Sequence, residues 1–139
     1  MNPEAYPSDT YGALIVRVST ALGTIPIENA AVNVRGITEP DTGVLYSLRT
    51  DRDGKTPRVI LKTPPLSESA IPERVPYSLY AVDVYADGYL PLTVERVAVF
   101  PTVLSVQPAS LIPNTEYRGA VPPYGGRQSL TDASKGGQT

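Results

Sequence analysis

The residues with the clearest chemical potential lie in the stretch SLRTDRDGKTPRVIL, residues 47–61. Asp51 and Asp53 are two positions apart, and Gly54 follows directly. Carboxylate oxygens at alternate positions suit Ca²⁺, so these two aspartates are the candidate metal ligands. An EF-hand loop ends in a bidentate glutamate, however, and the matching position holds Lys62. Because aspartate and glycine also favour turns, the stretch predicts a tight hairpin between two strands, with calcium binding as the alternative.

The composition lacks the side chains that enzymes use most. The 139 residues include no cysteine and no histidine. Their absence excludes thiol catalysis, thiolate metal sites, a Ser-His-Asp relay and an ordinary zinc site. No phosphate-binding loop or nucleophile–base pair is recognisable either. We therefore expect no enzyme, no catalytic residue and no cofactor.

The charge balance and hydropathy limit the classes of partner. Twelve basic residues face fourteen acidic ones, which gives no basic footprint for nucleic acid. No apolar run approaches the roughly 20 residues that a membrane helix needs, so no membrane insertion is expected. MNPEAYPSDT, residues 1–10, has no basic and apolar leader pattern. We expect cytoplasmic synthesis and delivery to a surface or extracellular site without a Sec signal.

Apolar and polar residues alternate in seven short stretches, which is typical of half-buried strands. These stretches cover residues 11–20, 30–37, 44–50, 57–63, 77–86, 92–101 and 103–113. In the clearest of them the inward-facing residues are expected to be Leu14, Val16, Val18, Val32, Val34, Tyr80, Val82 and Val84. The alternation shifts phase near Glu95 and Arg96, where a β-bulge would return Val97 and Val99 to the face of Val94.

The pattern predicts an all-β fold, a seven-stranded antiparallel Greek-key β-sandwich spanning residues 11–113. Fifteen prolines and eleven glycines argue against long helices. Residues 1–10 are expected to form an N-terminal arm. Residues 114–139 form a Gly/Pro-rich C-terminal tail, whose few apolar groups cannot offset the entropy of ordering it alone. Both ends are therefore predicted to be flexible arms.

Tyrosine is the dominant aromatic residue, with nine copies against one phenylalanine and no tryptophan. Tyr46, Tyr80 and Tyr89 are expected in or beside the core. Four others fall in or next to the arms, where amphipathic rings suit contact with another subunit. The predicted interface residues are Tyr6, Tyr11, Tyr117 and Tyr124.

An internal Lys–Asn isopeptide bond is a further possibility for a surface sandwich with lysines at 55 and 62. That chemistry needs a buried carboxylate beside the two partners, and Asp83 is the one carboxylate in the middle of a predicted strand. The natural lysine position on the first strand holds Arg17, which stays protonated and cannot act as the nucleophile. The bond is not expected.

Three segments together resemble the carboxypeptidase regulatory-like, or transthyretin-like, family. They are GALIVRVSTALGTIPIENAAVNVRG, TDRDGKT and YAVDVYADGYLPLTVERVAVFP, within residues 11–113. TPPL, PYSLYAVDV, VFP and LIP are similar to single-domain members from clostridial spore formers. The 5-hydroxyisourate hydrolases of the same fold end in YRGS, and this chain has YRGA at 117–120. That hydrolase chemistry relies on histidine, so the resemblance does not extend to its activity.

These observations favour a non-enzymatic structural subunit that associates with itself through its arms and sheet edges. Head-to-tail contacts that do not close would give a fibre or a surface or coat assembly, such as a spore coat, an appendage or a particle. The expected partner is thus a further copy of the chain. The alternative is an accessory domain that binds peptidoglycan or another carbohydrate.

Overall fold

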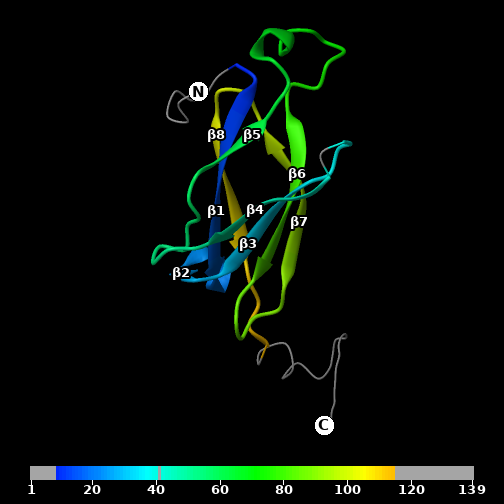
Figure 1. Cartoon of the computed structure of the whole chain (residues 1–139). Coiled ribbons are helices and arrows are strands. Elements are labelled where there is room, and N and C mark those ends of the chain that lie inside the picture. The colour runs from blue at the N-terminus through cyan, green and yellow to red at the C-terminus, as the bar shows by residue number, and fades with distance from the viewer. Residues whose placement is uncertain (1–8, 41, 115–139) are drawn as a thin grey trace.

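The computed structural model describes residues 9–40 and 42–114, which form eight strands in two facing sheets (Figure 1). Two short 3₁₀ turns, η1 (Ala21–Gly23) and η2 (Leu66–Glu68), are the helical elements of this part. The strands are β1 (Tyr11–Thr20), β2 (Ile25–Pro26), β3 (Ala31–Gly36), β4 (Gly43–Arg49), β5 (Val59–Lys62), β6 (Ser78–Tyr85), β7 (Leu92–Val99) and β8 (Leu104–Ser110).

Sheet A is built around β1. Strand β8 runs parallel to one edge of β1, while β2 and β5 pair antiparallel with the two ends of its other edge. Sheet B has the order β4-β3-β6-β7 and is antiparallel throughout. The predicted all-β sandwich is confirmed. It differs from the expectation in the parallel β1–β8 pair and in the two-residue strand β2, where Pro26 allows only a short edge pairing.

The core lies between the two sheets and is formed by the residues that the alternation placed inward. All eight predicted inward residues are buried: Leu14, Val16, Val18, Val32, Val34, Tyr80, Val82 and Val84. Branched side chains on strands of period two fill this layer from both sides. The periodicity therefore identified the core correctly.

The predicted bulge in β7 is present. Tyr80 stands opposite Val97 and Val82 opposite Val94, so Glu95 and Arg96 together face a single residue of β6. Arg96 takes a positive φ of 62° to accommodate the extra residue. Val97 and Val99 are buried as a result.

Two tyrosines of sheet B bridge to sheet A. The hydroxyl of Tyr46 donates to the carbonyl of Ile60 at 2.9 Å, and that of Tyr80 donates to the carbonyl of Lys62 at 2.6 Å. Both rings pack on the core while their hydroxyls bond the backbone of β5. This agrees with the predicted place of these tyrosines and fixes the short strand β5 against the facing sheet.

The predicted arms lie almost wholly outside the described residues, and so do Tyr6, Tyr117 and Tyr124. Tyr11 is described, and it is the first residue of β1 rather than part of an arm. Within residues 9–40 and 42–114, no helix has the length and apolar character that would let it cross a membrane.

Candidate functional site

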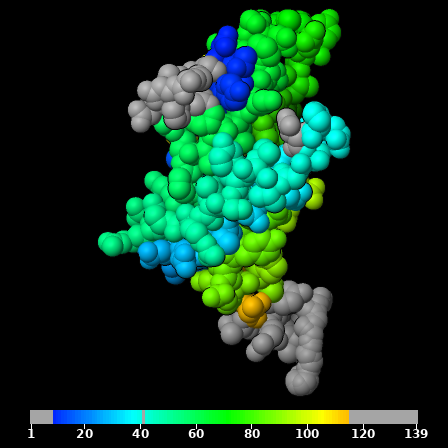
Figure 2. Space-filling model, in the orientation of Figure 1, coloured from blue at the N-terminus to red at the C-terminus, as the bar shows by residue number. Residues whose placement is uncertain are grey.

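Residues 50–58 connect the two sheets. Strand β4 before them belongs to sheet B, and β5 after them belongs to sheet A. The predicted hairpin between these strands is therefore wrong, since the two do not pair with each other. Alternation in both strands could not reveal that their apolar faces meet across the core rather than within one sheet. Figure 2 shows the blue-green surface of this crossover beside the blue surface near β2.

Asp51 shapes the turn at the start of this crossover. Its Oδ1 accepts hydrogen bonds from the backbone N–H of Asp53 at 2.9 Å and of Lys55 at 3.0 Å. The N–H of Gly54 donates to the Asp51 carbonyl at 2.9 Å. An aspartate that bonds the backbone two residues on is the usual device of such turns. The carboxylate of Asp51 thus has a structural task.

The crossover also completes one edge of β1, between the segments paired with β2 and β5. Val18 donates its N–H to the Gly54 carbonyl at 2.7 Å, and Thr56 donates its N–H to the Val16 carbonyl at 2.9 Å. The N–H of Val16 in turn donates to the buried hydroxyl of Thr56 at 3.0 Å. These contacts satisfy backbone groups that no strand reaches. The crossover, which holds the residues with the clearest chemical potential in the sequence, is thus a structural part of sheet A.

No group of three or more side chains suited to metal binding occurs in the described part of the chain. Asp51 and Asp53 stand together in the turn, but one oxygen of Asp51 already holds two N–H donors. Calcium prefers six to eight oxygen ligands, which two carboxylates cannot supply. Calcium binding at Asp51 and Asp53 stays an untested prediction.

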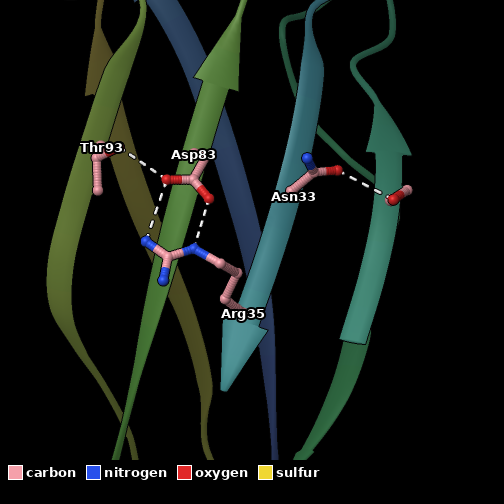
Figure 3. Close-up of polar contacts among 5 residues, drawn as sticks. Asn33, Arg35, Asp83 and Thr93 are labelled. Atoms are coloured by element: carbon pink, nitrogen blue, oxygen red, sulfur yellow. Dashed lines mark hydrogen bonds and ion pairs between the residues drawn. The ribbon is translucent and has the colours of Figure 1, made fainter. Parts of the chain in front are cut away.

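A polar row crosses the outer face of sheet B (Figure 3). The registers place Ser47, Asn33, Asp83 and Thr93 opposite one another on β4, β3, β6 and β7. Ser47 donates to Asn33 Oδ1 at 3.0 Å, and Thr93 donates to Asp83 Oδ1 at 2.7 Å. Arg35 of β3 adds Nε to Asp83 Oδ2 at 2.6 Å and Nη2 to Oδ1 at 3.3 Å. Three strands are therefore linked through one carboxylate.

This pairing fixes the charge of Asp83. The hydrogen bond from the Arg35 guanidinium, helped by that from Thr93, lowers the pKa of Asp83 below the usual aspartate value despite its burial. The same contact raises the pKa of Arg35. Both groups are ionised near neutral pH, and the side chain of Asp83 is only 11% exposed. Asp83 is thus an acceptor held in place.

The same geometry separates Asp83 from the isopeptide chemistry. Asp83 is buried beside Asn33, as that chemistry requires, but the cation that it contacts is Arg35. Lys55 and Lys62 both adjoin β1 in sheet A, on the other layer of the sandwich. The expectation that no such bond forms agrees with this arrangement.

An apolar face covers the outside of sheet A. Leu104 and Val106 of β8 lie beside Ala13 and Ile15 of β1, and Ile60 of β5 lies on the other side of Ala13. Leu104 is 48% exposed and Val106 is 52% exposed. The alternation of β1 places Tyr11 on this face as well, although sequence reasoning had assigned it to an arm. Ile15, Ile60, Leu104 and Val106 are called the apolar face below.

The open edge of β8 is less suited to strand addition than the sequence suggested. Ala13 donates to the Val103 carbonyl and Leu111 donates to the Ser19 carbonyl, so odd-numbered residues of this segment direct their backbone towards β1. Pro108, an even-numbered residue, therefore faces the open edge, where it has no N–H to donate. The Pro108 carbonyl accepts a hydrogen bond from Gln107 Nε2 at 2.8 Å. A proline on an edge hinders pairing with another strand.

Three features of these sites are not predicted from the sequence: the apolar face, Arg35 and Thr93. The sequence does carry a signal for the apolar face. Positions 104 and 106 are apolar and alternate with polar residues, and the neighbouring strand β1 has apolar residues on both of its faces. The Arg35–Asp83–Thr93 contact had no such signal. It depends on the register between strands that are far apart in sequence.

No protein-family model and no curated protein matches this sequence. Among solved structures, (S)-allantoin synthase is similar with a TM-score of 0.51 and 17% identity, over 74% of this chain and 42% of that one. Wild-type Acinetobacter radioresistens catechol 1,2 dioxygenase has a TM-score of 0.50 and 15% identity, over 91% of this chain and 58% of that one. GBS52, the minor pilin of Streptococcus agalactiae, has a TM-score of 0.47 and 10% identity, over 89% and 47%.

This chain spans less than two thirds of the length of each of those proteins. At such identities the likeness shows the fold alone. The resemblance to the carboxypeptidase regulatory-like family is thus supported only as far as the β-sandwich, and the family itself stays a prediction.

The prediction that the chain is not an enzyme needs correction. The solved structures that share its fold include an (S)-allantoin synthase and catechol 1,2 dioxygenases, so this is a fold on which enzymes are built. The absence of histidine and cysteine removes particular mechanisms rather than catalysis as such. Exclusion of an enzyme went further than the sequence allowed.

Proposed function

We propose that this chain is a structural β-sandwich subunit that associates with further copies of itself in a surface or coat assembly. The observation that carries the proposal is the apolar face on sheet A. Its branched residues lie on three neighbouring strands, β5, β1 and β8, and two of them are about half exposed. Contiguous exposed apolar residues are typical of a surface that a partner covers.

A second copy fits this face better than a small ligand. Three hollows in the described part of the chain lie elsewhere and are lined by none of its residues, so the face offers area rather than a concave site. Arg17 follows Ile15 on the same face of β1, and Lys62 of β5 pairs with Tyr11 at the other end of that face. Cationic residues therefore flank the apolar centre. An apolar centre with a charged rim is the usual composition of a protein–protein interface.

The face and the terminal segments have separate roles in this proposal. Pro108 hinders strand addition at the edge of β8, so contact occurs between faces. Tyr6, Tyr117 and Tyr124 then supply further contacts onto a neighbouring copy, as the sequence suggests. If one copy's apolar face meets a different surface of the next, the assembly grows as a fibre. Its site of action is a surface or appendage.

Analytical ultracentrifugation of the full chain over a range of concentrations tests the proposal. We expect concentration-dependent growth of the wild type and loss of that growth in Val106→Glu, which places a carboxylate in the apolar face. Val75→Glu is the matched control, since Val75 is 56% exposed but lies in the loop before β6. A wild type that stays monomeric at every concentration would overturn the proposal. If Val106→Glu grew as much as the wild type, the apolar face would not be the contact surface.

A further inference from the structure

A hollow of about 560 Å³ opens at the end of sheet B where β3 begins and β6 ends. The loop before β3 and the turn between β6 and β7 form its sides. Its lining includes Glu28, Ala31, Arg49, Tyr85, Asp87 and Tyr89. None of these residues belongs to the apolar face, which lies on the opposite sheet.

The floor of the hollow follows from a single small residue. Ala31 of β3 stands between Arg49 of β4 and Tyr85 of β6 in the strand register. The methyl group of Ala31 fills little of the space between two long side chains on the same face of the sheet. The result is a depression with the Arg49 guanidinium on one wall and the Tyr85 ring on the other.

The walls combine a flat apolar surface with hydrogen-bonding groups. Tyr85 is 49% exposed, and Tyr89, which also lines the hollow, packs against the core. Glu28 and Asp87 are exposed carboxylates that offer acceptors. Arg49 Nη1 donates to the Asn29 carbonyl at 3.2 Å, which orients the guanidinium and its remaining donors.

We propose that this hollow binds a neutral oligosaccharide. One sugar ring would lie on the exposed ring of Tyr85, while its hydroxyl groups donate to Glu28 and Asp87 and accept from Arg49. Pyranose rings have apolar C–H faces and polar edges, so an aromatic wall beside fixed donors and acceptors matches both. Two carboxylates against one guanidinium disfavour an anion, and three charged side chains disfavour a purely apolar ligand.

The polar row lies beside the hollow on the same face of sheet B and would contact a second sugar unit. Asp83 lies two residues before Tyr85 on β6, which places it about 7 Å further along the same face. The row of Ser47, Asn33, Asp83 and Thr93 thus continues the polar surface away from the hollow. Arg35, whose side chain is 35% exposed, adds donors there. A linear chain of sugars would follow the strands rather than cross them.

An NMR titration of the ¹⁵N-labelled full chain tests this assignment. The probes are four neutral trisaccharides, maltotriose, cellotriose, mannotriose and N,N′,N″-triacetylchitotriose, each at millimolar concentration. We expect at least one to shift amide signals of residues 27–31, 49 and 85–91. No shift with any of the four would overturn the proposal. Shifts at these residues with choline or lysine, and with none of the four probes, would replace the sugar by a cationic amine.

Variants at Tyr85 locate the ligand on the ring. Tyr85→Ala should weaken binding at least about fivefold, while Tyr85→Phe, which keeps the ring, should bind within about twofold of the wild type. Val44→Ala on β4 is the control, because Val44 is exposed but does not line the hollow. Native dispersion of the amide spectrum shows that each variant folds. Unchanged binding in Tyr85→Ala would contradict the proposed site. Val106→Glu should bind as the wild type does, so this test is independent of self-association.

Discussion

Asp83 and Arg35 form a forked ion pair on the outer face of sheet B, with Nε to Oδ2 at 2.6 Å and Nη2 to Oδ1 at 3.3 Å. Thr93 donates to the same Oδ1 from the other neighbouring strand. Charge-assisted hydrogen bonds of this kind are about twice as strong as neutral ones. Side chains thus join β3, β6 and β7 in addition to the backbone ladder.

We expect Asp83→Asn to lower the free energy of unfolding by about 1–3 kcal/mol. An amide keeps the shape of the carboxylate but cannot accept from Arg35 at both of its ends. Urea denaturation followed by tyrosine fluorescence measures the change. Asp53→Asn is the control, because Asp53 is exposed and its replacement should change stability by less than about 0.5 kcal/mol. Equal urea midpoints for wild type and Asp83→Asn would show that the ion pair contributes nothing.

The same pair predicts a pH dependence. The pKa of Asp83 is lower in the folded chain than in the unfolded one, chiefly because of Arg35. Its stabilisation is therefore fully present above the ordinary aspartate pKa of about 3.9 and is lost as the pH falls through the lowered folded value. The stability difference between wild type and Asp83→Asn should shrink on acidification. A difference that stays constant down to the acid transition would contradict this assignment.

Removal of metal is expected to leave stability unchanged. Asp51 Oδ1 accepts two backbone N–H bonds, so its carboxylate supports the turn without an ion. Melting temperatures measured with EDTA and with added calcium should agree. Asp51→Ala should cost about 1–2 kcal/mol in either condition, since two N–H groups lose their acceptor. A melting temperature that rises with calcium in the wild type, and not in Asp51→Ala, would instead establish a calcium site.

The sequence was informative wherever a single strand determined the outcome. Period-two alternation identified Val16, Val32 and Val82 as core residues without knowledge of their partners. The phase break at Glu95 and Arg96 located the bulge for the same reason, because one strand's own pattern must be repaired there. Local signals of this kind need no information about topology.

Features that depend on which strands pair could not be predicted. Strands β4 and β5 are neighbours in sequence, yet they lie in different sheets, so the hairpin expected between them is a crossover. The parallel alignment of β8 with β1 joins segments about 90 residues apart, as in the pair of Ser19 and Ser110. The contact of Asp83 with Arg35 and the hollow around Ala31 both follow from cross-strand register, which alternation alone leaves open.

Gly54 gives the sharpest test of how the crossover is held. A Cβ there would lie 2.3 Å from the Val18 carbonyl oxygen, and the residue has a φ of +78°. Gly54→Ala should therefore cost at least about 3 kcal/mol, the sum of backbone strain and a clash with β1. Gly88→Ala is the matched control: its φ is +87°, but nothing lies within 4 Å of the added carbon. It should cost only about 1 kcal/mol, from strain alone. Equal urea midpoints for the two variants would show that residues 54–56 do not pack on β1 as described.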